Sequence, residues 1–137
     1  MRRKVREKAL QVLYQWDMRD IPMQEIFRLD PPPSDWKEDD REFFLCLTRG
    51  VEKQLQCIDR SIMELTPGWP LHRMATVDRN ILRIAVHEIL NVPDISVKIA
   101  INEAVVLAKK FSTEESGKFI NGVLGKLAKN IASSNKK

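Results

Sequence analysis

Residues 97–131 read VKIAINEAVVLAKKFSTEESGKFINGVLGKLAKNI, and this stretch decides the fold class. On both sides of the polar segment 112–116, apolar residues recur every three or four positions, which is the spacing of amphipathic helices. Ser112 followed by Glu115 indicates a capping box at the start of the second helix. We therefore expect one helix over 97–110 and a last helix to about Ile131, with residues 133–137 as a frayed tail.

The same period runs through the rest of the chain, and no alternating run predicts a strand. Prolines at 31–33 and the segment 66–70 interrupt the helical pattern. Four further helical regions are expected, over 3–19, after Pro22, from 34 or 35 to 65, and within 70–91. The prediction is an all-α bundle of six or seven helices in a single domain over residues 1–137.

Composition excludes several classes of protein. No apolar run approaches the ~18 residues that a membrane span needs, and no apolar segment follows the basic start as in a secretory signal. Cys46 and Cys57 fall in one expected helix, too far apart for a disulfide, and have no metal-ligand spacing. We expect a soluble, cytoplasmic chain with no cofactor and no metal.

Nothing in the sequence marks an enzyme. A glycine-rich phosphate loop is missing, His72 and His87 lie far apart, and no carboxylate pair is marked as acid and base. A binding function is therefore expected instead of a catalytic one.

Positive charge gathers at both ends of the chain. Residues 1–8 hold five basic side chains and one acid, and residues 118–137 hold five lysines and no acid. Because the net charge is only +4, the middle of the chain is acidic. The two ends could form one anion-binding surface if they meet in space, or they could be two solvated basic tails.

Two aromatic residues lie close to these basic ends. Tyr14 is placed on an edge of the first helix with Arg3, and Phe119 follows Lys118 in the last helix. Cations attract phosphates and aromatic faces stack on unpaired bases, so both positions suit single-stranded nucleic acid. Either ring could equally pack against a neighbouring helix, and exposure beside the cations would distinguish the two interpretations.

Several motifs together resemble the NusB family over nearly the whole chain. They are RRKVREKALQVLYQW at the start, LTRGV around Gly50, VDRNILRIAVHEIL at 77–90, VKIAINEAVVLAKKF and GKFINGVLGKLA. The resemblance implies a double three-helix bundle that is not an enzyme. It also implies pairing with NusE, a small-subunit ribosomal protein, and binding to the boxA element of ribosomal RNA leaders for RNA polymerase antitermination.

The resemblance also assigns roles by position. RNA-backbone contacts are implied at Arg2, Arg3, Lys4 and Arg6, and the second part of the RNA surface at Tyr14, Lys118 and Phe119. Asp78 would face NusE, with Arg83 near it, and Glu115 would limit the strength of the complex through its charge.

Three positions depart from the family pattern. The basic arm is short, Ser112 replaces a glycine, and Gly125 stands within the last helix, where glycine costs ~1 kcal/mol relative to alanine. Two other functions stay open: a helical module that binds only protein, and the NusB-like domain of a ribosomal-RNA cytosine methyltransferase, which would need a further large domain. Monomer and homodimer are both compatible with the sequence.

Overall fold

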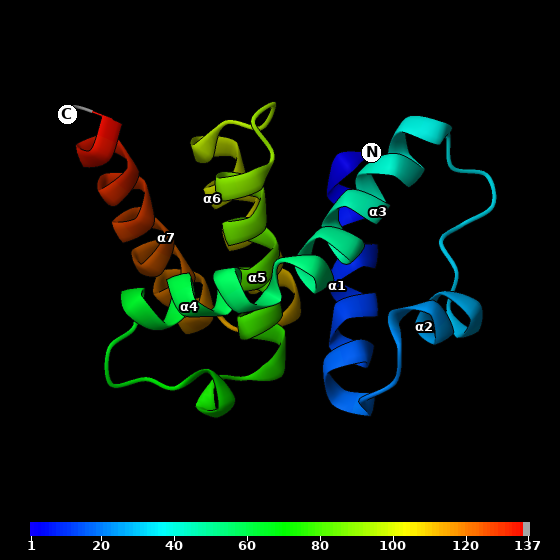
Figure 1. Ribbon diagram of the computed structural model, residues 1–137, viewed down its shortest axis with the longest axis horizontal. Coiled ribbons are helices and arrows are strands. Elements are labelled where there is room, and N and C mark those ends of the chain that lie inside the picture. The colour runs from blue at the N-terminus through cyan, green and yellow to red at the C-terminus, as the bar shows by residue number, and fades with distance from the viewer. Residues whose placement is uncertain (136–137) are drawn as a thin grey trace.

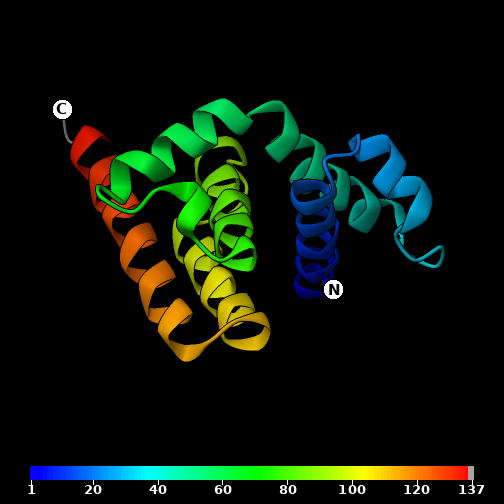
Figure 2. The same ribbon diagram turned by 90° about the horizontal axis from the view of Figure 1, so that it is seen from below.

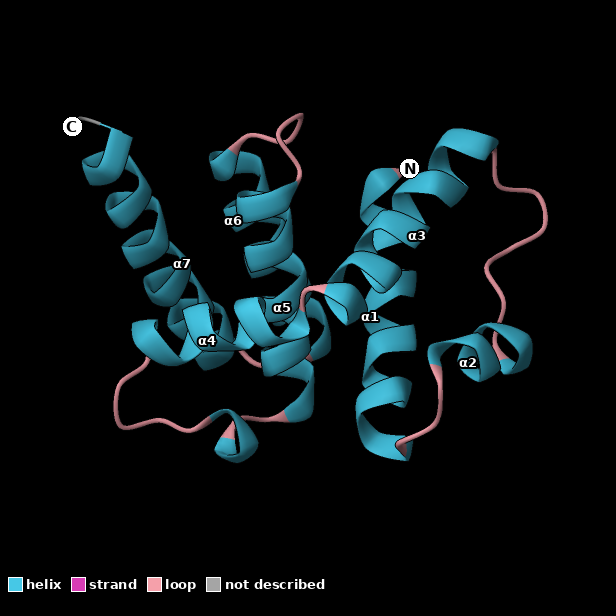
Figure 3. Cartoon of the chain, viewed as in Figure 1, coloured by secondary structure: helices cyan, strands magenta, loops and turns pink. Residues whose placement is uncertain are grey.

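The computed structural model describes residues 1–135, which form seven α-helices, one short 3₁₀ helix and no strand (Figures 1 and 3). The elements are α1 (Arg2–Arg19), α2 (Met23–Leu29), α3 (Glu38–Lys53), α4 (Leu55–Leu65), η1 (Leu71–Arg73), α5 (Thr76–Asn91), α6 (Val97–Phe111) and α7 (Glu114–Asn135). The prediction of an all-α bundle is confirmed. None of the helices within residues 1–135 combines the length and apolar character that crossing a membrane requires.

Helix α5 lies at the centre of the molecule. It packs against α1 and α3 on one side and against α4, α6 and α7 on the other (Figure 1). Every residue from Asn80 to Glu88 is buried, because a helix with neighbours all round leaves no solvent face. Helix α5 therefore belongs to the core of both groups, the one with α1 and α3 and the one with α4, α6 and α7.

The long helix expected up to Leu65 is two helices. Helix α3 ends at Lys53, Gln54 leaves helical geometry at φ −102° and ψ 18°, and α4 begins at Leu55. Figure 2 shows the resulting change of direction, which carries the chain from the α1 side of α5 to the α7 side. The apolar period continues in phase across Gln54, so the sequence gives no sign of the break. Cys46 and Cys57 lie on different helices, and both are free.

The cap of α7 also differs from the expectation. The Ser116 amide donates a hydrogen bond to Thr113 Oγ1 over 2.9 Å, so Thr113 caps the helix. The Ser112 amide instead donates to the Ala108 carbonyl and closes α6. The predicted box of Ser112 with Glu115 is wrong by one position. Residues 133–135 belong to α7, and residues 136–137 of the expected tail lie outside the described residues.

Candidate nucleic-acid interface

The basic start of α1 meets the basic end of α6. Lys110 Nζ lies 2.9 Å from Glu7 Oε2, and Arg3 Nε lies 3.1 Å from Glu103 Oε2. Arg3, Glu7 and Lys110, with Met1 and exposed Lys4, surround a hollow of about 500 Å³. Arg3 and Lys110 are each more than half exposed, and exposed ion pairs of this kind are weak enough to exchange partners. The hollow can therefore offer cations to an anionic ligand.

Arg2 and Arg6 point toward the opposite side of α1. Arg6 is buried and pairs with Glu88 on α5 at 2.6 Å. The guanidinium of Arg2 lies 4.4 Å from the centre of the Phe43 ring on α3. The expectation that Arg6 contacts RNA is contradicted, because its guanidinium is committed to a buried carboxylate. Burial raises the pKa of Glu88 even though Arg6 opposes that shift, as expected for a pair with little solvent around it.

Tyr14 lines a second hollow, further along α1. Its side chain is 39% exposed, and Phe111 at the end of α6, 37% exposed, borders the same space of about 350 Å³. Leu10 and Val77 form the apolar lining beside them. Tyr14 is thus accessible, with an aromatic neighbour that the sequence analysis missed. The only signal for Phe111 was its place after two lysines at the end of a helix.

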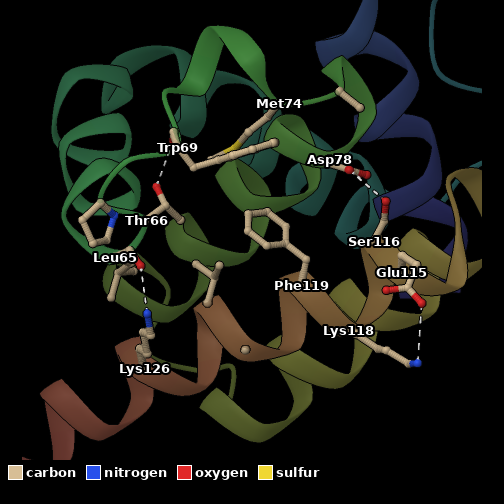
Figure 4. Close-up of a pocket in the computed structure, with 14 residues that line it drawn as sticks. Leu65, Thr66, Trp69, Met74, Asp78, Glu115, Ser116, Lys118, Phe119 and Lys126 are labelled. Atoms are coloured by element: carbon tan, nitrogen blue, oxygen red, sulfur yellow. Dashed lines mark hydrogen bonds and ion pairs between the residues drawn. The ribbon is translucent and has the colours of Figure 1, made fainter.

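Lys118 and Phe119 point in different directions. Phe119 turns into a groove of about 670 Å³ between α7 and the segment joining α4 to α5, whereas Lys118 points away from it (Figure 4). Lys118 Nζ lies 3.6 Å from Glu115 Oε1, and both side chains are largely exposed. Such a pair contributes little stability, so Lys118 is free to meet a ligand.

Asp78 lines the Phe119 groove, and the preceding residue, Val77, lines the Tyr14 hollow. Ser116 Oγ donates to Asp78 Oδ2 over 2.8 Å and ties α5 to the first turn of α7. The other oxygen, Oδ1, is buried and has no hydrogen-bond partner among the described residues. Asp78 as a whole is half-buried and lines the groove, so its side chain borders the space that a docking molecule would enter.

Arg83 is not placed for contact with a partner. It is buried, with Nε 2.9 Å from Asp59 Oδ1 and Nη1 3.0 Å from Asp17 Oδ2. Its guanidinium joins α1, α4 and α5, which contradicts the expectation that it faces NusE. Burial acts to raise the pKa of Asp17, but hydrogen bonds from Arg79 and Asn80 and the charge of Arg83 together hold that pKa below its ordinary value.

Fold and surface together define a small helical protein that acts by binding. Two hollows and a groove follow one another from the start of α1 to α7, with exposed cations and aromatic rings beside them. Within residues 1–135, no group of histidine, cysteine and carboxylate side chains is arranged to hold a metal ion.

The chain belongs to the NusB family. The family model described as NusB matches residues 3–129. A transcription antitermination protein NusB of Dehalococcoides mccartyi is 37% identical over 98% of this chain and 94% of its own length. The protein of that name in Acetivibrio thermocellus is 43% identical over 93% of this chain and 88% of its own length. The family is not enzymatic, in agreement with the sequence analysis.

Solved structures of the family share the fold. T. maritima NusB superposes with a TM-score of 0.88 and 35% identity, covering 94% of this chain and 91% of that one. A complex of the antitermination factors NusB and NusE with double-stranded RNA contains a chain that matches with a TM-score of 0.81 and 28% identity, covering 94% of this chain and 96% of that one.

Proposed function

We propose that this chain is an RNA-binding transcription antitermination factor. With NusE it binds the boxA element of ribosomal RNA leader transcripts and tethers that RNA to transcribing RNA polymerase. The observation that carries the proposal is the alignment of exposed cations and aromatic rings from α1 to α7 on a chain of the NusB family. Since this work takes place on nascent bacterial RNA, we place the protein in the cytoplasm.

Phosphates and bases have separate contact points on this surface. Arg3, Lys4 and Lys118 hold the backbone by charge, and Arg2 joins them from the α3 side of the first turn. Tyr14 and Phe119 offer their rings to unpaired bases, since each good stack contributes ~1–3 kcal/mol and tolerates any base. Arg6 does not touch RNA in this proposal, because it holds α1 against α5.

NusE docks beside Asp78. Half-buried Asp78 lines the Phe119 groove and follows Val77, which lines the Tyr14 hollow, so a partner there borders both RNA-contacting rings. The partner then adds its own RNA surface to this one. We expect the pair to bind the element more tightly than this chain does alone.

The test is fluorescence anisotropy with labelled boxA RNA, with and without NusE, over a series of salt concentrations. We expect affinity to fall steeply with salt, to rise with NusE, and to be lower for a scrambled RNA. Light scattering on the same samples tells whether a monomer or a homodimer binds. If NusE binds but RNA affinity never depends on this chain, the protein is a module that binds only protein.

A further inference from the structure

A tryptophan is displayed on a firmly built turn between α4 and η1. The Trp69 amide donates to the Thr66 carbonyl over 3.0 Å, and Gly68 has φ +81°, which together with Pro67 makes a type II turn. Buried Thr66 anchors the turn by donating from Oγ1 to the Ile62 carbonyl over 2.9 Å. Trp69 is nevertheless 51% exposed. An exposed aromatic side chain carried by a fixed turn of the backbone is typical of a binding site.

The opposite wall of the groove is one face of α7. Phe119, Gly122, Val123 and Lys126 line it at helical spacing (Figure 4). A Cβ added at Gly122 would meet no atom within 4 Å, so the wall is open there. Phe119 and Trp69 therefore face the same open space from opposite sides.

The charge of α7 favours an anionic ligand. From Ser116 to Asn135 the helix carries lysines and no acid. Lys126 Nζ lies at the end of the groove away from Asp78 and Glu115, and within residues 1–135 its one polar contact is a long 3.5 Å hydrogen bond to the Leu65 carbonyl. The two carboxylates repel phosphate at one end of the groove, and Lys126 attracts it at the other.

We propose that Trp69, Phe119 and Lys126 form a slot for one unpaired base of single-stranded RNA and its phosphate. The base stacks on the aromatic rings, and the Lys126 ammonium neutralises the phosphate. The slot continues the RNA surface beyond Phe119, so this inference rests on the proposed function. A purely apolar peptide would leave Lys126 and the basic face of α7 without a role.

The first test compares the boxA RNA affinity of Trp69→Ala, Trp69→Phe and Leu29→Ala. Leu29 is a similarly exposed apolar residue on α2, far from α7 (Figure 1). We expect Trp69→Ala to weaken binding at least about fivefold, the size of one lost base–aromatic stack. Trp69→Phe retains a ring and should stay close to the wild type, as should Leu29→Ala. Thermal melts verify that each variant is folded.

A second pair tests the phosphate contact independently of Trp69. Lys126→Gln and Lys129→Gln remove the same charge from α7, but only Lys126 lines the groove. We expect Lys126→Gln to weaken binding more and to lower the salt slope by about 0.7, the share of one phosphate contact.

Three outcomes would overturn the slot. If Trp69→Ala and Lys126→Gln both bind RNA as tightly as the wild type, the slot is rejected and the proposed function stands. Lost NusE affinity with unchanged RNA affinity would make the groove a protein-docking site. A wild-type chain that contributes no RNA affinity, with or without NusE, would reject the slot and the proposed function together.

Discussion

The cations at the start of α1 and those along α7 look alike in sequence but do different work. At the start of α1, Arg6 is buried against Glu88, whereas the pair of Arg3 with Glu103 is exposed and can open for a ligand. Among the described residues, Lys118 on α7 instead meets an exposed glutamate one turn away, and Lys126 meets a distant carbonyl. A basic residue becomes structural where another helix buries it against an acid, and it stays available for a ligand where it remains exposed.

Position in the fold explains this difference. Helix α1 packs against α3 and α5 and meets carboxylates on α5 and α6, whereas α7 runs along the outer edge of the molecule (Figure 1). Charged side chains near the centre must find partners because an unpaired buried charge is expensive. Charged side chains at the edge are satisfied by water.

The largest effect on stability is expected from breaking the buried ion pair of Arg6 with Glu88. Arg6→Ala should lower the free energy of unfolding by ~3–5 kcal/mol, since it leaves Glu88 buried and unpaired. Lys118→Ala is the matched control and should change stability by less than ~1 kcal/mol. Urea denaturation measures both. Equal losses of stability in the two variants would show that Arg6 is no more structural than Lys118.

Asp17 is a carboxylate that, like Arg6, is held in the centre of the fold by charges from another helix. Asp17→Asn should cost about 2–3 kcal/mol at pH 7, because Arg79 and Arg83 lose the carboxylate between them. The folded-state pKa of Asp17 is lowered, so its contribution is present above the unfolded pKa and is lost as the pH falls below about 4. Denaturation at several pH values should show the two proteins converging in acid. A gap that stays constant would mean that the charge of Asp17 does not stabilise the fold.

Two glycines sharpen the comparison of centre and edge. A Cβ at Gly50 on α3 would lie 2.2 Å from the His87 ring on α5, whereas one at Gly125 on α7 meets nothing within 4 Å. Gly50→Ala should cost about 1–3 kcal/mol through overpacking. Gly125→Ala should gain up to ~1 kcal/mol from helix propensity alone. Thermal unfolding of both variants checks the signs, and a stabilised Gly50→Ala would disprove the close packing of α3 on α5.

The smallest effect is expected from the exposed ion pair of Glu115 with Lys118 on α7, and it concerns RNA binding. Glu115→Gln removes a negative charge beside Lys118 and should tighten RNA binding by up to about threefold at low salt. The gain should vanish at high salt, where exposed charges are screened. Anisotropy at two salt concentrations measures it, with Glu114→Gln as a neighbouring control. Weaker binding by a folded Glu115→Gln would reverse the sign of the proposed effect.

Periodicity in the sequence was enough to predict the helical regions, but it left the accessibility of Tyr14 open. It could not predict the break at Gln54, because the apolar spacing continues in phase while the packing partners change from one side of α5 to the other. The Thr113 cap was missed by one residue, since two adjacent hydroxyl side chains both fit the capping pattern.

The site residues that were misplaced share a single cause. Arg6 meets Glu88 across 82 positions of the chain, and Arg83 meets Asp17 across 66. No local pattern carries such pairings, so both arginines looked free. Phe111 and Trp69 were missed for the opposite reason: each looked like an ordinary residue at the end of an element, and only the packing of distant helices left it exposed beside a hollow.

The position of α5 in both groups of helices has a consequence for thermal unfolding. Neither group of helices keeps a complete core without α5, so we expect the chain to unfold in a single cooperative transition. RNA held on α1 or on α7 then stabilises every helix at once, raising one melting temperature with ligand concentration. The thermal midpoint of the whole protein thereby reports on occupancy at either end of its surface.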